Sequence, residues 1–212
     1  MKDCIVVDVE TGPSENASEF FGEFEAPSNY TDPKKIAAYI ENAKAKAIEK
    51  AALSAITGRI LVIGVLHPFQ DEPMYFEGNE KDLLTAFWTH YRERGKGDQV
   101  AALPWVGFNI KQFDMPFLTR RSWVHGVKVP PVFTDRGYLL PHFIDVRETW
   151  CCGDRQAEGS LDVIARLMGL PGKPGGMTGA DFARVYAEDK PKALAYLKYD
   201  LTTTRTLAEK LL

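Results

Sequence analysis

With 212 residues, 45% of them hydrophobic, the chain is long enough to bury a sizeable core as one domain or as one domain with an insertion. The formal net charge of −3 at pH 7 excludes the overall basic character of a nucleic-acid coat protein, although not a local basic track. No apolar run approaches the length of a membrane span, and no charged and apolar leader precedes the first strand, so we expect no membrane association.

The three cysteines predict a cytoplasmic protein with reduced thiols, because an odd count does not suit a disulfide framework. Cys151 and Cys152 lie close to His142 in the sequence, which raises the alternative of a metal-thiolate site. Adjacent side chains in a strand point in different directions, and no second cysteine pair exists. We therefore favour structural or neutral roles for these cysteines.

Hydrophobic periodicity and capping signals divide the chain into strands and helices. Asp32 as N-cap and Pro33 in the first turn predict the start of a helix, and Gly58 its end. Asp114 stands where it could cap a later helix. The expected strands cover 4–9, 59–67, 73–76, 105–108 and 142–146, and the expected helices cover 32–57, 80–94, 115–125, 160–168, 179–188 and 191–211. Loops are expected at 13–32 and at the glycine-rich 169–176.

This order of elements predicts an α/β fold, a mixed five-stranded sheet flanked by helices on both faces. The three early strands can form a meander, and the two later ones join it through crossover helices. The ribonuclease H-like fold has this order, here with an inserted helix between strands 1 and 2. We expect a single domain over residues 1–212, with the helical insertion at about 32–57.

The first strand carries two carboxylates, Asp8 and Glu10, one residue apart. Side chains alternate along a strand, so both project from the same face while Val7 and Val9 enter the other. Two neighbouring carboxylates repel each other and are costly to bury without a cation. A half-exposed edge strand is the alternative, but the surrounding apolar residues indicate burial.

Asp114 and Asp200 bring the number of candidate carboxylates to four. Hard divalent cations prefer oxygen ligands, and four carboxylates offset the four positive charges of two such ions. A pair of Mg²⁺ or Mn²⁺ ions can activate a water and stabilise the leaving oxygen in phosphodiester hydrolysis. The sequence therefore predicts a metal site made of Asp8, Glu10, Asp114 and Asp200.

Tyr196 and Asp200 lie four residues apart in an expected helix and so share one face. A phenol beside a metal-binding carboxylate can orient an attacking water, and its ordinary pKa near 10 makes it a poor base. Taken alone, this pair would more often be a core tyrosine and a solvated aspartate. Together with the other carboxylates, it indicates a catalytic tyrosine.

These motifs resemble those of the DEDD exonuclease superfamily in its tyrosine-bearing branch (DEDDy), because Ala195 stands where the other branch has histidine. The chain is most similar to stand-alone exonucleases that resemble the proofreading domain of family B DNA polymerases. Further shared motifs are Thr57–Leu61, Phe143–Asp145, Ser160–Asp162 and Leu167–Lys173.

The resemblance implies roles for individual residues. Asp8, Glu10 and Asp200 would hold the tighter metal, with Asp8 bridging to the second ion and Asp114 acting largely through bound water. Four further residues would contact substrate: Thr11 and Gly12 the terminal 3′ nucleotide, Asn109 a phosphate or sugar, and Phe113 the cleft wall. Asn109 could equally cap a turn, and Phe113 could equally be core.

Lys173, in the glycine-rich segment, is a candidate for contacting a substrate phosphate. This role predicts that Lys173→Ala raises KM and leaves the metal affinity unchanged. The lysines of the inserted helix would form a solvated face or, with Phe20, Phe21 and Tyr30, a rail for a single strand.

We expect a 3′–5′ exonuclease that converts single-stranded or frayed DNA 3′ ends to 5′-mononucleotides. An RNase D-like exoribonuclease and a non-catalytic nucleic-acid-binding module are the alternatives.

Overall fold

The computed structural model describes residues 3–94, 103–154 and 156–212. Five strands and seven α-helices follow one another along the described chain. The strands are β1 (Ile5–Pro13), β2 (Gly58–Leu66), β3 (Met74–Glu77), β4 (Trp105–Gly107) and β5 (Phe143–Asp145). The α-helices are α1 (Pro33–Ala51), α2 (Glu80–Arg94), α3 (Asp114–Val124), α4 (Val146–Cys151), α5 (Leu161–Leu167), α6 (Phe182–Glu188) and α7 (Lys190–Leu211).

The chain divides into two compact units. The first consists of Met1–Glu10 with Ile60–Leu212, and the second is Thr11–Arg59. The second unit contains a 3₁₀ turn at Ala17–Phe20 and helix α1, which Asp32 caps by accepting a hydrogen bond from the Lys34 N–H. Within this unit the Thr11 hydroxyl donates to the Ala52 carbonyl at 2.7 Å. The expectation of a single domain with an insertion stays a prediction.

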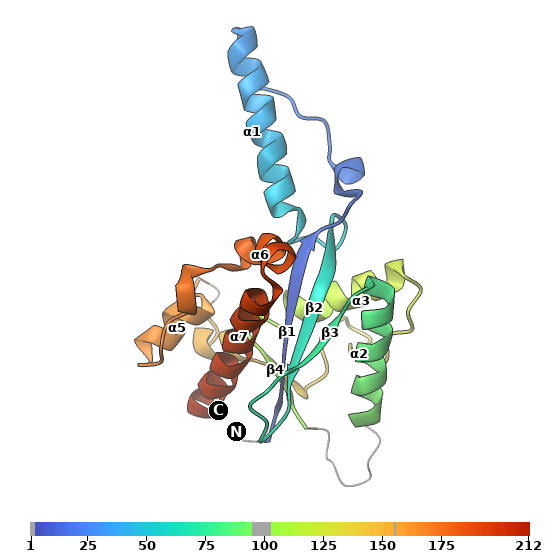
Figure 1. Ribbon diagram of the computed structural model, residues 1–212, viewed down its shortest axis with the longest axis vertical. Helices are drawn as coiled ribbons and strands as arrows, with labels where there is room; N and C mark the ends of the chain where they lie inside the picture. Colours follow the sequence, from blue (N-terminus) through green and yellow to red (C-terminus); the bar gives the residue numbers. More distant parts are fainter. Residues whose placement is uncertain (1–2, 95–102, 155) are drawn as a thin grey trace. The chain divides into compact units, whose positions relative to one another are not determined.

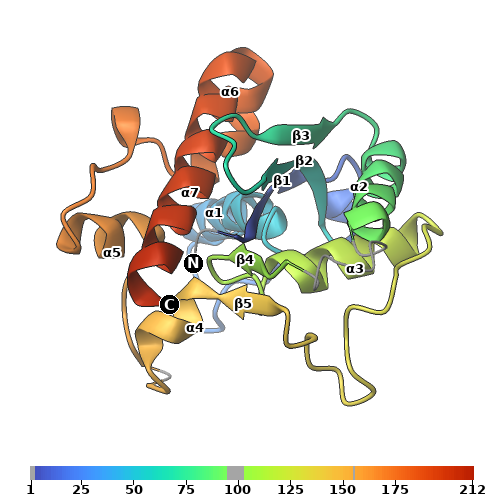
Figure 2. The ribbon, with the colours of Figure 1, turned by 90° about the horizontal axis from the view of Figure 1, so that it is seen from below.

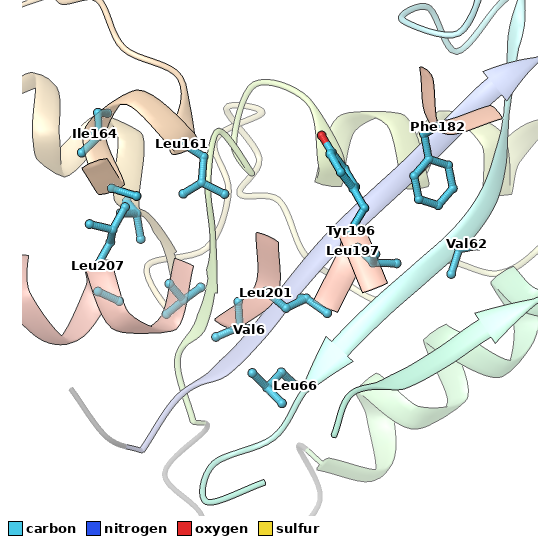
Figure 3. Close-up of a cluster of buried hydrophobic side chains, with 14 of the residues drawn as sticks. Val6, Val62, Leu66, Leu161, Ile164, Phe182, Tyr196, Leu197, Leu201 and Leu207 are labelled. Carbon is cyan, nitrogen blue, oxygen red and sulfur yellow. The ribbon is translucent and has the colours of Figure 1, made fainter. Parts of the chain in front are cut away.

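The first unit is built on a mixed sheet with the strand order β3-β2-β1-β4-β5. β2 pairs with β3 in antiparallel fashion, whereas β4 is parallel to both β1 and β5. Figure 3 shows β1 and β2 running in opposite directions, as the meander requires. Helices α5, α6 and α7 cover one face of the sheet, and α2 and α3 cover the other (Figure 2).

The main core lies between the sheet and α7, the long C-terminal helix in Figure 1. The buried positions of α7 recur every three or four residues, which places one stripe of the helix against the sheet. Leu197 and Leu201 from this stripe pack with Val6 of β1 (Figure 3). Gly64 of β2 allows the close approach, because a Cβ there would lie 2.8 Å from Leu201 Cδ1.

On the opposite face, α2 and α3 are joined by buried polar contacts. Trp88 of α2 donates its indole N–H to the Ser122 hydroxyl of α3 at 2.7 Å. Glu80 accepts hydrogen bonds from the Ile60 N–H and from the Arg121 guanidinium, and lies 2.8 Å from His125 Nε2. The start of α2 is thereby fixed to both β2 and α3.

The largest differences between the observed and the expected elements lie in four places. Gly179–Asp181 forms a 3₁₀ turn before α6 rather than the first turn of that helix. β1 continues to Pro13 rather than ending at residue 9, and α1 ends at Ala51, with turns rather than helix up to Thr57. Helix α4 was not expected. Asp145 caps it by accepting hydrogen bonds from the Arg147 and Glu148 N–H groups directly after β5.

None of the described helices is both long enough and apolar enough to cross a membrane.

Candidate active site

Three of the predicted carboxylates converge between β1 and α7. Within the described part of the chain, Asp8, Glu10 and Asp200 form a group whose potential ligand atoms all lie within 4.8 Å of one another. Alternation along β1 places Asp8 and Glu10 on the face that α7 covers, beside Val6. The helical stripe that buries Leu197 and Leu201 also buries Asp200. Packing of α7 on the sheet therefore assembles this acidic cluster.

Asp114 belongs to the same region although it lies outside that group of three. It is buried and occupies the first turn of α3, and its Oδ1 accepts a hydrogen bond from the Val9 N–H at 3.0 Å. Its expected role as the cap of α3 was wrong, because Phe113 stands at the cap position and makes no side-chain cap bond. The carboxylate instead faces β1, which ties the start of α3 to the strand that carries Asp8 and Glu10.

The clustered carboxyl groups have raised pKa values. Burial and the charge of Asp200 raise the pKa of Asp8 to about 7. Burial, followed by the charge of Asp8, raises the pKa values of Glu10 and Asp114 well above their usual range. The pKa of Asp200 is raised by burial even though Lys173 opposes the shift. Each group is thus costly to ionise unless a cation lies nearby.

Lys173 reaches the cluster from the segment between α5 and α6. Its ammonium donates to Asp200 Oδ2 at 2.8 Å and to the Tyr196 hydroxyl at 2.6 Å, and it lies 4.0 Å from the centre of the Tyr196 ring. The backbone holds this position, because the Lys173 N–H donates to Asp162 Oδ1 and the Tyr199 hydroxyl donates to the Pro171 carbonyl. The predicted contact with a substrate phosphate stays a prediction.

Tyr196 lies one helical turn before Asp200 and belongs to both the core and the site. Its ring is part of the hydrophobic core (Figure 3), while its hydroxyl meets the Lys173 ammonium. Burial and the charges of Asp200, Glu10 and Asp8 raise the pKa of Tyr196. The phenol therefore stays protonated near neutral pH and can donate a hydrogen bond.

The other residues predicted to contact substrate occupy different positions. Asn109 follows β4 in a left-handed conformation (φ 65°), and its carbonyl accepts hydrogen bonds from the Gln112 and Phe113 N–H groups. It therefore opens a turn, and the Phe113 ring packs against Phe117 with centroids 5.4 Å apart. Thr11 and Gly12 belong to the second unit, and their contact with a terminal nucleotide stays a prediction.

Two further aspartates position parts of the site, although the sequence alone indicates no individual role for them. Asp145 accepts hydrogen bonds from the Asn109 and Lys111 N–H groups and thereby fixes the turn after β4. Asp162 fixes the backbone of Lys173. They lie in the short motifs Phe143–Asp145 and Ser160–Asp162, which were the available signal. The partners of Asp145 are more than thirty residues away in sequence, whereas Lys173 lies eleven residues after Asp162.

The donors present fit a hard divalent cation. The acidic cluster offers only carboxylate oxygens, which Mg²⁺ and Mn²⁺ prefer. Asp200 Oδ1 is buried and has no hydrogen-bond partner among the described residues, and coordination would satisfy it. The raised pKa values of the group also favour a bound cation, since its positive charge would lower the cost of ionising the carboxyl groups.

Comparison with known proteins identifies the family. Residues 62–207 match the family described as predicted 3′–5′ exonucleases related to the exonuclease domain of PolB. No curated protein matches the chain. Among solved structures, the family B DNA polymerase from the hyperthermophilic archaeon Pyrobaculum calidifontis is similar, with a TM-score of 0.64 and 17% sequence identity.

That match covers 98% of this chain and 24% of the polymerase chain, so the chain spans about a quarter of the polymerase's length. At this level of identity the likeness establishes the fold, a mixed five-stranded sheet flanked by helices as in the ribonuclease H-like exonuclease domain. The family match itself extends over most of the chain. The protein therefore belongs to the family of predicted 3′–5′ exonucleases related to the exonuclease domain of PolB.

Proposed function

We propose that the protein is a metal-dependent exonuclease that shortens single-stranded or frayed DNA from the 3′ end and releases 5′-mononucleotides. The observation that carries this proposal is the acidic cluster of Asp8, Glu10 and Asp200, with the Tyr196 hydroxyl beside it. Membership of an exonuclease family supports the same reaction class. We propose DNA rather than RNA as the substrate because the similar solved structure is a DNA polymerase.

The four carboxylates would hold two divalent ions, Mg²⁺ or Mn²⁺, with Asp8, Glu10 and Asp200 at one ion and Asp8 and Asp114 toward the other. Such ions supply an activated water and stabilise the charge on the leaving 3′ oxygen. Burial excludes bulk water from Glu10, Asp114 and Asp200, which strengthens their attraction for cations.

Tyr196 would orient the attacking water. Its raised pKa keeps the phenol protonated, so it can act as a hydrogen-bond donor of fixed direction rather than as a base. The packing of its ring in the core restrains that direction. Lys173, held against Asp200 and Tyr196, places a positive charge where an anionic phosphodiester would enter.

The test is hydrolysis of 5′-labelled single-stranded DNA and of RNA with the same sequence, in Mg²⁺ and then in Mn²⁺. We expect the DNA to shorten stepwise from its 3′ end. Asp8→Ala should abolish the reaction, and Tyr196→Phe should lower kcat by about 100-fold, because it removes one orienting hydroxyl and leaves the ring packing intact.

Three other results would change the assignment. Faster loss of RNA would make the protein an exoribonuclease with the same site. Cleavage that survives Asp8→Ala would exclude the acidic cluster as the catalytic centre. Tight Mn²⁺ binding without cleavage of the DNA or the RNA would leave a nucleic-acid-binding module and would overturn the proposal.

A further inference from the structure

A large cavity opens beside the carboxyl ends of the parallel strands β4 and β5. Its volume is about 1180 Å³, and residues of α3, of α4 and of the connection between α3 and β5 line it. In α/β sheets, ligands bind outside the carboxyl ends of parallel strands. We propose that this cavity holds the nucleotides that precede the 3′ terminus of a single-stranded substrate. The inference rests on the proposed exonuclease function and names where the rest of the strand binds.

Helix α3 links the cavity to the acidic cluster. Pro116, Thr119, Arg120 and Trp123 are spaced by three or four residues, so one face of α3 lines the cavity. The same helix begins at Asp114, whose carboxylate faces β1. At 1.5 Å per residue, Asp114 and Trp123 lie roughly 13 Å apart along the helix axis. A strand that ends at the carboxylates would reach Trp123 within a few nucleotides.

Two exposed aromatic rings line the cavity. Trp123 on α3 is 68% exposed, and Tyr138 on the connection to β5 is 71% exposed. Tyr138 is held at a tight turn, where Thr134 and Tyr138 exchange hydrogen bonds and Phe133 forms an isolated bridge with Leu139. Figure 2 shows this connection leaving α3 and returning to β5. Exposed rings of this kind are the surfaces on which unpaired bases stack.

Three basic and three acidic side chains line the cavity: Lys111, Arg120 and Arg147, and Asp145, Glu148 and Asp154. Asp145 accepts backbone hydrogen bonds at both oxygens, and Glu148 pairs with the Lys111 ammonium at 2.5 Å. In contrast, neither Arg120 nor Arg147 takes part in a salt bridge within the described chain. Arg147 donates a hydrogen bond to Asn109 Oδ1 at 3.5 Å. Both guanidinium groups therefore keep donors that can bind phosphates.

The test measures hydrolysis of oligothymidylates from two to about 12 nucleotides, a range that spans the site sizes of single-strand-binding grooves. For the wild-type protein we expect KM to fall with length. Trp123→Ala and Tyr138→Ala should raise KM for the longer substrates on the order of 10-fold, with kcat and the dinucleotide unaffected. Tyr138→Phe, which keeps the ring, should behave as wild type, and Phe69→Ala, which removes an exposed ring elsewhere, is the control.

The same length dependence in wild type and in both alanine variants would overturn the inference and leave the proposed function intact. If the wild type cleaves nothing, the proposed function fails, and the cavity is then tested by the fluorescence anisotropy of a labelled oligothymidylate. Weaker binding by Trp123→Ala than by Phe69→Ala would still support the cavity. Equal binding by these two variants would reject it.

Discussion

At the scale of single residues, the acidic cluster is held together by the groups that oppose its charge. Lys173 contributes one positive charge at 2.8 Å from Asp200 Oδ2, and the Val9 N–H supports Asp114. The carboxylates raise one another's pKa values, so the ionisation of one opposes the ionisation of the next. The site is therefore more sensitive to a change in one charge than an exposed group of acidic residues would be.

The sequence alone predicts that loss of Lys173 leaves metal affinity unchanged, but its ammonium lies 2.8 Å from Asp200 Oδ2. Lys173→Met is therefore expected to increase the affinity for Mn²⁺ about tenfold, because it removes a positive charge beside a carboxylate proposed to bind metal. Isothermal titration calorimetry of the variant and of the wild type measures this change. Lys111→Met, which removes an ammonium paired with Glu148, is the control. An unchanged affinity would contradict this prediction.

The candidate catalytic residues could be identified from the sequence more readily than the residues that position them. Asp8 and Glu10 follow from alternation in one strand, and Tyr196 with Asp200 from helical spacing, so local periodicity predicts that each pair shares a face. The role of Asp145 was not predictable in this way, because its partners Asn109 and Lys111 lie more than thirty residues away. Such contacts depend on the packing of strands, which local spacing does not encode.

At the scale of secondary structure, the approach of elements to one another depends on two glycines in the sheet. A Cβ at Gly107 of β4 would lie 2.7 Å from Ile110 Cβ and 3.0 Å from the Val7 carbonyl oxygen, neither of which can move freely. A Cβ at Gly64 of β2 would instead meet the ends of the Leu201 and Leu197 side chains. The two positions therefore differ in how easily they accept a methyl group.

Gly107→Ala is expected to lower the free energy of unfolding by about 1–3 kcal/mol, because the added methyl group overpacks the turn between β4 and α3. Gly64→Ala should cost less, since leucine side chains can change rotamer. Gly22→Ala, where nothing lies within 4 Å, is the control. Urea unfolding measures all three, and equal midpoints for Gly107→Ala and Gly22→Ala would contradict the argument.

The long helices could be predicted because their hydrophobic pattern repeats over several helical turns. The strands could be predicted from short apolar runs bounded by turn residues. Helix α4 could not, since it is six residues long and directly follows β5, where a helical and an extended pattern look alike. The extension of β1 to Pro13 and the end of α1 at Ala51 were also missed. Element ends depend on tertiary hydrogen bonds, such as that from the Ser14 N–H to the Thr57 carbonyl.

At the scale of the whole molecule, the buried carboxylates connect metal binding, protonation and stability. In the metal-free folded protein the pKa values of the carboxyl groups are raised. The folded state therefore binds more protons than the unfolded state at pH values between the ordinary carboxyl pKa near 4 and the raised pKa values. Their contribution to stability is therefore present at low pH and is lost as pH rises through about 7, the raised pKa of Asp8. A divalent cation binds the deprotonated form and reverses this trend.

Asp8→Asn is expected to separate this contribution from the titration of all other groups. In EDTA the variant and the wild type should have similar Tm values near pH 4, and the variant should melt at the higher temperature near pH 8, because it carries no charge at this position. Saturating Mn²⁺ should raise the Tm of the wild type at pH 8 by about 5–10 °C and that of the variant by less. Differential scanning fluorimetry across this pH range, with EDTA or Mn²⁺, measures both effects. A metal-free wild type that stays more stable than Asp8→Asn at pH 8 would show that the Asp8 charge is already compensated within the protein, and the acidic cluster would then not need a metal to ionise.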